Sequence, residues 1–352
     1  MRLEFINRIK EDEILGKNIF TSEGKILLKS GTKLTKTYLE KMKNLGVYYI
    51  YIMDERLGDI SVEDEVLTEL KQHTMNSIST IIKSTFNYNK KQMSDSLNTV
   101  ENLIQYIISN GDINKSLYDI QTYSNSTYVH SLNVCIMSIF LGQALGLGEK
   151  NLTELGIAAI LHDIGKQKVP ANILNKMAPL TQEETDELKR HTIYGEEILR
   201  KNVRISEPII RAVLEHHERV DGNGYPHGLV DAQICRFAKI ISVSDVYDTI
   251  SNTQTYKKNY TPQDSYELIL AGSNILFDKL VVQKFRQTFA IYPLGCCVRL
   301  SNGVEGYVII QNDNFPDRPI VRVLYDSVTK EPIPFYEIDL LKNLNLVIKD
   351  II

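Results

Sequence analysis

The sequence predicts a mainly α-helical protein with a small α+β unit at its N-terminus and a small all-β module at its C-terminus. Apolar residues recur at helical spacing through most of the chain up to about residue 290. After that point the pattern changes to short β-type runs that are separated by glycines and prolines. In addition, most of the histidines fall into one ordered pattern within the helical part. We therefore expect four parts, comprising residues 1–56, 57–117, 118–290 and 291–352.

The first part has the pattern of a small mixed unit. Two short apolar runs flank Ser22, Glu23 and Gly24, which is typical of a β-hairpin. Thr35 is expected to cap a helix over residues 36–45, and a strand is expected over residues 47–52. Nothing in this unit points to catalysis.

The second and fourth parts are expected to flank a helical core. In residues 57–117 apolar side chains make one stripe on each of two helices, so both helices are expected to pack on the following domain. A coiled-coil stalk is disfavoured because sustained heptads are absent. The strands of residues 291–352 are short and closely spaced, which predicts a barrel-like module of five or six strands.

Charge and composition exclude several classes of function. The 352 residues include 40 Lys and Arg against 44 Asp and Glu, a net charge of −4, so binding to long nucleic acid is not indicated. No apolar run approaches the ~18 residues of a membrane span, and no signal peptide is recognisable. The four cysteines lack CxxC spacing, so we expect reduced thiols in a cytoplasmic protein. Metal ligands are therefore sought among His, Asp and Glu.

Five of the seven histidines and two aspartates form one ordered pattern with intervals of roughly 25 to 32 positions. Imidazoles and carboxylates are ligands of transition metals, and seven of them are too many for one ion but suit two ions that share a bridge. The pattern therefore predicts a two-metal hydrolytic site. The seven residues are His130, His162, Asp163, His191, His216, His217 and Asp245.

Two stretches around this pattern resemble a known family. The run His162-Asp163-Ile164-Gly165-Lys166 and residues 216–226, which include Gly224-Tyr225-Pro226, resemble the HD-GYP domain. This family is the branch of the HD superfamily that hydrolyses cyclic di-GMP, and the likeness covers about 170 residues. The resemblance implies an all-helical HD-superfamily domain with cyclic di-GMP phosphodiesterase activity in signalling.

The resemblance also implies a role for each member of the pattern. Asp163 would bridge two divalent ions, with iron as the first choice and manganese as the second. His130, His162 and Asp245 would complete one ion, and His191, His216 and His217 the other. A metal-activated hydroxide would then open cyclic di-GMP to pGpG. Further cleavage to GMP, and the use of a related cyclic dinucleotide, are left open.

Substrate contacts are expected from residues beside the ligands. Lys166 would hold the scissile phosphate and act with Asp163 as a catalytic residue, and Asp248 would orient the same phosphate. Arg219 and Tyr225 are expected to line the substrate pocket, with the alternative that their loop only braces the helix that carries His216 and His217.

Two positions depart from the family pattern. Ser126 stands where some members have a glutamate that helps to hold a third ion, so we expect two ions. Gln254 stands where many members have an arginine that contacts phosphate. Lys257 or Lys258 is the expected substitute for that arginine.

Two other functions compete with hydrolysis. One is a di-iron oxygenase, and the other is a catalytically weak module that binds a cyclic dinucleotide or a protein. The flanking units are expected to regulate or assemble the protein, either as a homodimer or with a signalling partner.

Overall fold

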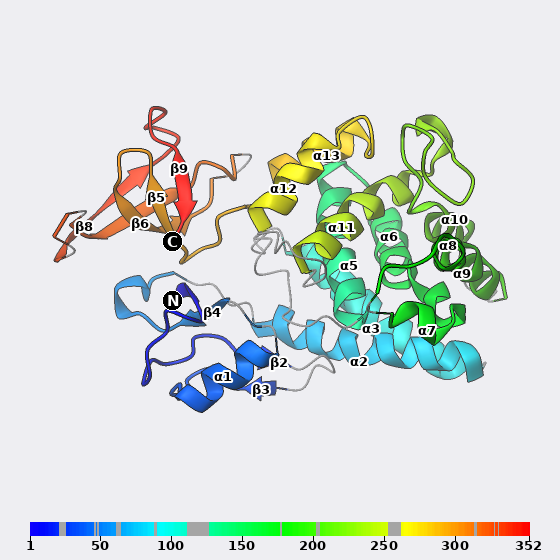
Figure 1. Cartoon of the computed structure of the whole chain (residues 1–352), viewed down its shortest axis with the longest axis horizontal. Coiled ribbons are helices and arrows are strands. Elements are labelled where there is room, and N and C mark those ends of the chain that lie inside the picture. The colour runs from blue at the N-terminus through cyan, green and yellow to red at the C-terminus, as the bar shows by residue number, and fades with distance from the viewer. Residues whose placement is uncertain are drawn as a thin grey trace. The chain divides into compact units, whose positions relative to one another are not determined.

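The computed structural model of the chain describes residues 1–20, 26–45, 47, 49–60, 65–87, 90–110, 127–176, 178–201, 205–252, 262–312, 315–326, 328–329 and 331–352. They fall into two compact units. The first, the terminal unit, combines the described residues up to 68 with those from 286 onward. The second, the helical unit, contains the described residues between 69 and 285. Figure 1 shows the elements of both units by label.

The N-terminal part of the terminal unit confirms the predicted hairpin and helix. Strand β2 (Ile19–Phe20) pairs antiparallel with β3 (Ile26–Leu28), and β1 (Arg2–Phe5) pairs antiparallel with β4 (Tyr49–Ile52). Helix α1 (Lys36–Asn44) begins where Thr35 accepts a hydrogen bond from the backbone N–H of Tyr38 at 3.3 Å. The predicted turn at residues 22–24 lies outside the described residues.

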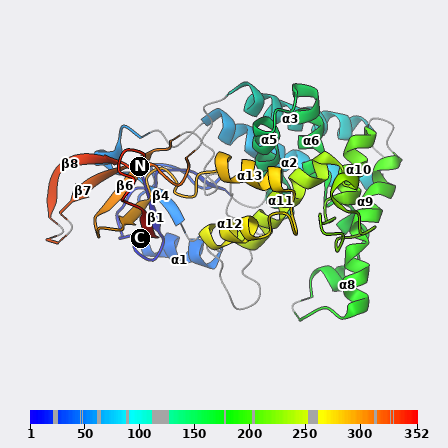
Figure 2. The same ribbon diagram turned by 90° about the horizontal axis from the view of Figure 1, so that it is seen from above.

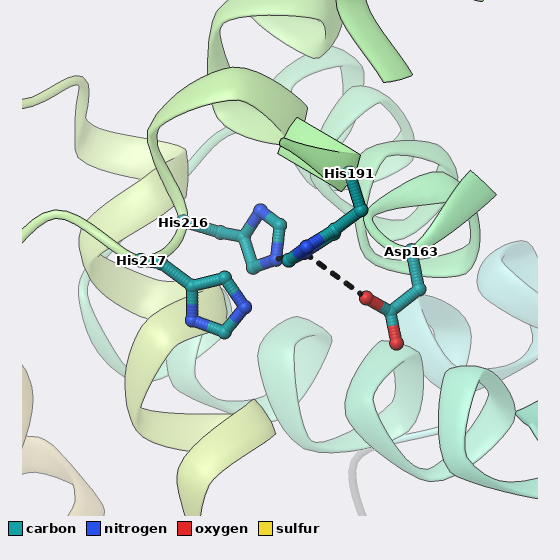
Figure 3. Close-up of side chains that lie close together, drawn as sticks. All are labelled: Asp163, His191, His216 and His217. Carbon is teal, nitrogen blue, oxygen red and sulfur yellow. Dashed lines mark hydrogen bonds and ion pairs between the residues drawn. The ribbon is translucent and has the colours of Figure 1, made fainter. Parts of the chain in front are cut away.

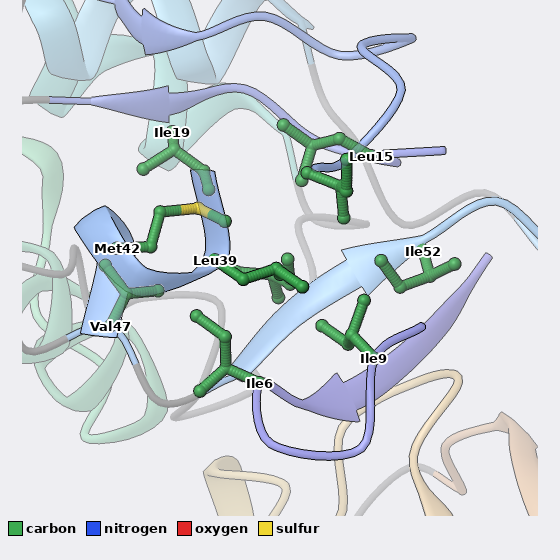
Figure 4. Close-up of a cluster of buried hydrophobic side chains, with 10 residues drawn as sticks. Ile6, Ile9, Leu15, Ile19, Leu39, Met42, Val47 and Ile52 are labelled. Carbon is green, nitrogen blue, oxygen red and sulfur yellow. The ribbon is translucent and has the colours of Figure 1, made fainter. Parts of the chain in front are cut away.

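A small apolar core holds these elements together. Figure 4 shows side chains from α1, β4 and the segments before them pointing toward one another. The buried members are Ile6, Ile9, Leu15, Ile19, Leu34, Leu39, Met42, Val47, Ile50 and Ile52. Because apolar burial is the main favourable term in folding, this cluster accounts for a mixed unit with such short strands.

The C-terminal part of the terminal unit is an open five-stranded antiparallel sheet. Its strand order is β8-β7-β6-β5-β9. The prediction of short β-strands is thus confirmed, but β8 and β9 do not pair among the described strands, so the sheet is not a closed barrel. Pro332 and Pro334 on β8 have no N–H to donate, which protects that edge from further pairing. The strands are β5 (Cys297–Leu300), β6 (Glu305–Ile310), β7 (Ile320–Tyr325), β8 (Pro332–Asp339) and β9 (Ile348–Ile351).

The N-terminal and C-terminal parts of the terminal unit are in contact with each other. The backbone N–H of Leu3 donates to the carbonyl of Gly295 at 2.9 Å. Gly295 has a φ of +79°, and a Cβ there would lie 2.5 Å from the carbonyl oxygen of Met1, so this contact requires glycine. Arg322 on β7 makes a second link, because its guanidinium donates to Asp59 at 2.8 Å and to Glu337 at 2.8 Å.

The helical unit is built mainly of helices (Figures 1 and 2), and many of their apolar side chains are buried. Helix α5 is apolar on nearly all sides and is buried among its neighbours, as expected for such a helix. The predicted connector helices are α2 and α3, and α3 packs on α6, where a Cβ at Gly156 would lie 2.6 Å from Ile104. The helices are α2 (Glu65–Asn87), α3 (Lys90–Ser109), α5 (Thr127–Ala144), α6 (Glu149–Leu161), α7 (Ala171–Leu174), α8 (Gln182–Lys189), α9 (His191–Arg200), α10 (Glu207–Glu215), α11 (Arg236–Asn252), α12 (Pro262–Ala271) and α13 (Lys279–Thr288).

The helical unit thus confirms the prediction of a mainly helical protein. Within the described part of the chain, none of the helices has the length and apolar character of a membrane span.

The link at Arg322 gives a test of the terminal unit. Arg322 is 7% exposed and serves two carboxylates, so Arg322→Ala is expected to lower the free energy of unfolding by about 1–3 kcal/mol. Arg299→Ala on the same sheet removes a more exposed pair with Glu305 and is expected to cost no more than ~1 kcal/mol. Thermal and urea denaturation of the full chain measure both losses. Equal losses in the free energy of unfolding for the two variants would show that the ion pairs of Arg322 with Asp59 and Glu337 do not stabilise the unit.

Candidate metal centre

Seven side chains from five separate segments of the chain converge inside the helical unit. Their potential ligand atoms form two groups, and within each group these atoms lie within 4.8 Å of one another. One group comprises His130, His162 and Asp245, and the other comprises Asp163, His191, His216 and His217, which Figure 3 shows pointing toward one another. The two groups have the same members as the two ligand sets expected from the sequence, with the bridging Asp163 placed in the second.

Three of the histidines use Nδ1 in the same way: His162 and His216 directly follow α6 and α10, and His191 is the first residue of α9. The distances from Nδ1 to the carbonyl oxygen three residues earlier are 2.7 Å for His162, 2.7 Å for His191 and 2.8 Å for His216. These carbonyls belong to the last turns of α6, α8 and α10, where the helix supplies no partner. Because a carbonyl only accepts, Nδ1 must carry the hydrogen, and Nε2 keeps the lone pair that a metal requires.

His130 on α5 is held by a carboxylate instead. Its Nδ1 lies 2.8 Å from Oδ2 of Asp248, and its Nε2 lies 3.1 Å from Oδ1 of Asp245. Asp248 is only 1% exposed and also accepts a hydrogen bond from Asn133 at 2.9 Å. The structure therefore places Asp248 against His130, and the phosphate contact expected from the sequence stays a prediction.

Asp163 lies between the two groups and offers one oxygen to each. Its Oδ2 lies 3.4 Å from Nε2 of His162, and its Oδ1 lies 3.5 Å from Nε2 of His191. Oδ1 is buried and has no hydrogen-bond partner among the described residues. A buried anionic oxygen without a partner is costly, so the donor set fits divalent metal ions.

Burial controls the charge of the surrounding imidazoles. It lowers the pKa of His216 well below its ordinary range, lowers that of His191, and lowers the pKa of His217 to about 4. These three rings are therefore neutral near pH 7, which is the form that binds metals. His130 is different. Burial alone would lower its pKa, but hydrogen bonds to Asp245 and Asp248 outweigh that effect and raise the pKa to about 10.

The two carboxylates of the cluster stay ionised. Burial alone would raise the pKa of Asp163, but Lys166 and His162 bring it well below its ordinary range. Burial likewise opposes ionisation of Asp245, but the hydrogen bond with His130 together with the nearby rings of His217 and His162 lowers its pKa well below the ordinary range. The centre thus combines two anionic carboxylates with the neutral imidazoles of His191, His216 and His217, which is an attractive environment for cations.

Among the described residues, Lys166 brings a positive charge into contact with this centre. It lies on the short 3₁₀ segment η2 (Ile164–Lys168), and its Nζ is 2.5 Å from Oδ2 of Asp163. Burial lowers its pKa, but Asp163 and Asp245 raise it above the ordinary value, so the ammonium keeps its charge. Its side chain is 35% exposed, so the ammonium can also be reached from solvent.

The loop after α10 covers the second group with an aromatic ring. The Tyr225 ring stacks on His217 at a centroid distance of 4.7 Å and an interplanar angle of 27°. The loop is folded tightly, because a Cβ at Gly224 would lie 2.3 Å from the backbone nitrogen of Arg219. The Arg219 guanidinium donates to Asp221 at 2.5 Å within the loop.

Sequence reasoning missed one residue that shapes this loop. Glu218 is buried, and its carboxylate accepts hydrogen bonds from the backbone N–H groups of His227 at 2.7 Å and Leu229 at 2.9 Å. The signal was its place directly after two histidines, since a buried acid next to a ligand pair needs donors. The expected positions Ser126, Gln254, Lys257 and Lys258 lie outside the described residues.

The fold and site together define an all-helical domain with a buried His/Asp cluster that suits divalent metal ions. Comparison with known families agrees: residues 124–281 match the HD domain, and residues 297–352 match the KOW domain associated with HD domain. The chain therefore carries an HD domain, and the resemblance seen in its sequence is confirmed at this level.

Curated relatives and a solved structure extend this comparison. The chain is 38% identical over 225 residues to the cyclic di-GMP phosphodiesterase PA4108 of Pseudomonas aeruginosa, covering 64% of this chain and 54% of that protein. It is 27% identical over 246 residues to the 3′3′-cGAMP-specific phosphodiesterase 2 of Vibrio cholerae, covering 68% of this chain and 45% of that protein. The chain thus spans about half the length of these relatives.

Other curated relatives are also named cyclic di-GMP phosphodiesterases. Among solved structures, the chain resembles Bd1817, an HDG"Y"P protein from Bdellovibrio bacteriovorus, with a TM-score of 0.53 and 17% identity. The match covers 80% of this chain and 97% of that one. At this identity the structural likeness shows the fold.

Close backbone packing at Gly165 gives a test of how the centre is held. A Cβ at this position would lie 1.9 Å from the carbonyl oxygen of His191, so η2 and α9 would have to move apart. Gly165→Ala is expected to cost about 1–3 kcal/mol in the free energy of unfolding and to weaken uptake of divalent ions. Gly148→Ala is the matched control, because a Cβ there meets nothing within 4 Å.

Thermal denaturation and equilibrium dialysis against Mn²⁺ measure the two effects. A Gly165→Ala variant as stable as Gly148→Ala, with unchanged ion uptake, would show that this close approach is not required.

Proposed function

We propose that this chain is a metal-dependent phosphodiesterase that hydrolyses cyclic di-GMP to linear pGpG. The main support for the proposal is the position of Asp163. Its carboxylate is buried and directs one oxygen at each of the two ligand groups. Relatives that are named cyclic di-GMP phosphodiesterases support the substrate class. Continued cleavage to GMP is a separate step that depends on whether pGpG is retained.

The donor set favours iron, with manganese as the second choice. Five imidazoles and two carboxylates suit these ions better than magnesium, which prefers oxygen ligands. Two such ions, when bound, lower the pKa of water and stabilise charge on the attacking and leaving oxygens of a phosphoryl displacement. The chain's own side chains hold the ions and position the substrate.

Each side chain of the centre contributes by its protonation state and orientation. His162, His191 and His216 are held with Nε2 toward the centre by their helix-end carbonyls, so little reorganisation is needed when ions bind. Lys166 supplies a positive charge beside Asp163 that can pair with a non-bridging phosphate oxygen. Charge that develops on the phosphate during hydrolysis would be stabilised by this ammonium.

The loop over the second group offers a surface for the nucleotide. The Tyr225 ring lies on His217, which places an aromatic face at the edge of the centre where a guanine can stack. Arg219 is already paired with Asp221, so we assign it to bracing the loop and not to binding phosphate. Lys257 and Lys258 stay sequence-based proposals for contacts with the second phosphate.

Removal of the shared carboxylate tests the proposed activity directly. The full chain is purified anaerobically, loaded with Fe²⁺ or Mn²⁺, and incubated with cyclic di-GMP while products are followed by chromatography. We expect pGpG from the wild type and a loss of at least ~10³-fold in kcat for Asp163→Ala, because both ions lose a ligand. Elemental analysis is expected to give two ions per active chain.

Three outcomes contradict the proposal. Hydrolysis that persists in Asp163→Ala would identify a contaminating enzyme. Intact metal loading without hydrolysis of cyclic di-GMP or 3′3′-cGAMP would favour a binding module. Three ions per active chain would contradict the two-ion assignment.

The role of Lys166 can be tested by comparison with Lys168, a nearby lysine that serves as a control. Lys166→Ala is expected to lower kcat/KM by roughly 10²- to 10³-fold while leaving the ion content unchanged, because it removes a charge that faces the phosphate. Lys168→Ala, which removes an exposed lysine paired with Glu197, is expected to resemble the wild type. Equal activities for the two variants would remove Lys166 from the mechanism.

A further inference from the structure

Four histidines have Nδ1 no more than 2.8 Å from a hydrogen-bond partner, and they are held in two different ways. His162, His191 and His216 use neutral backbone carbonyls, whereas His130 uses the carboxylate of Asp248. An ionised carboxylate only accepts hydrogen bonds, so Nδ1 of His130 must carry the hydrogen. Its Nε2 then points toward Asp245 and His162, at 3.1 and 3.2 Å.

Asn133 holds the carboxylate of Asp248 in place, and Asp248 in turn holds His130. Its side-chain amide donates to Oδ1 of Asp248 at 2.9 Å, while Oδ2 of Asp248 receives Nδ1 of His130 at 2.8 Å. Asn133 is fully buried and Asp248 is 1% exposed, so both bonds are shielded from water. Asn133 and His130 lie one turn apart on α5, so one helix positions both donors around the same carboxylate.

The extra carboxylate makes the two ligand groups electrostatically unequal. The group of His130, His162 and Asp245 has one carboxylate of its own and a second, Asp248, behind His130. The group of His191, His216 and His217 has Asp163 within it and Oδ2 of Asp245 at 3.8 Å from Nδ1 of His217, but no further carboxylate comparable to Asp248 contacts it among the described residues. Because each nearby negative charge attracts a divalent ion through a low-dielectric interior, the first group is the stronger position.

We propose that Asp248 is a positioning residue that holds His130 through Nδ1, and that the position of His130, His162 and Asp245 fills with a divalent ion before the position of Asp163, His191, His216 and His217. This inference rests on the proposed two-ion function and specifies how its centre is assembled. Asp248 thereby acts on the metal through His130 and not on the substrate.

Calorimetric titration of Mn²⁺ into the full chain, stripped of metal with a chelator, tests the order of filling. The wild type is expected to bind in two steps of different affinity. Asp248→Asn is expected to raise the Kd of the tighter step by roughly 10- to 100-fold and to leave the weaker step in place. His217→Gln is the counterpart for the second position and is expected to weaken only the weaker step.

A second measurement covers the case in which Asp248→Asn fails to fold. The ¹⁵N shifts of the histidine rings in the Zn²⁺-loaded wild type are expected to show His130 protonated at Nδ1 and bound through Nε2. Asn133→Ala, which leaves the carboxylate but removes its brace, is expected to weaken the same step as Asp248→Asn by a smaller factor.

Several results would overturn the inference. They are two equal sites in the wild type, an Asp248→Asn variant with unchanged affinities or a selectively weakened second step, and His130 bound through Nδ1. Failure of the proposed function is distinguishable. Two unequal Mn²⁺ binding steps without hydrolysis would contradict the proposed phosphodiesterase activity and support the order of metal binding. Hydrolysis by a protein with two equal sites would support the activity and contradict the order of metal binding.

Discussion

The buried carboxylate of Asp163 is the constraint on which the centre depends. It is 5% exposed, so its negative charge has to be balanced inside the protein. Lys166 balances one oxygen, but Oδ1 has no hydrogen-bond partner among the described residues. The neighbouring imidazoles His191, His216 and His217 have lowered pKa values and supply no positive charge near pH 7. Divalent ions satisfy this requirement, which is why the cluster suits metal and not a simple ion pair.

The ends of three helices turn this constraint into a defined geometry. The last turns of α6, α8 and α10 each leave carbonyl groups without helical partners. His162, His191 and His216 satisfy one such carbonyl each through Nδ1, and the same bond orients Nε2 toward the centre. A requirement of the helix and a requirement of the metal site are therefore met by one hydrogen bond. The close approach of Gly165 to His191 then holds η2, with Lys166, beside this frame.

Much of the fold and of the candidate site could be predicted because the relevant signals are local or ordered along the chain. The capping side chain of Thr35 predicts the start of α1. The regular spacing of the seven candidate ligands, and the likeness of the surrounding sequence to HD-GYP domains, predict the site. What could not be predicted depends on tertiary contacts. The contact of Asp248 with His130 joins residues on two helices, and the contact of Leu3 with Gly295 joins the two ends of the chain. The prolines of β8 were visible in the sequence, yet the place of β8 at the edge of an open sheet follows only from the pairing of the strands.

Anomalous X-ray diffraction from crystals of the Mn²⁺-loaded full chain tests the central claim most directly, because it locates ions independently of activity. We predict two anomalous peaks about 3.5–4 Å apart, with one oxygen of Asp163 bound to each. The first peak is expected among His130, His162 and Asp245, and the second among His191, His216 and His217. A single peak at full loading, or two peaks of which only one contacts Asp163, would contradict the account.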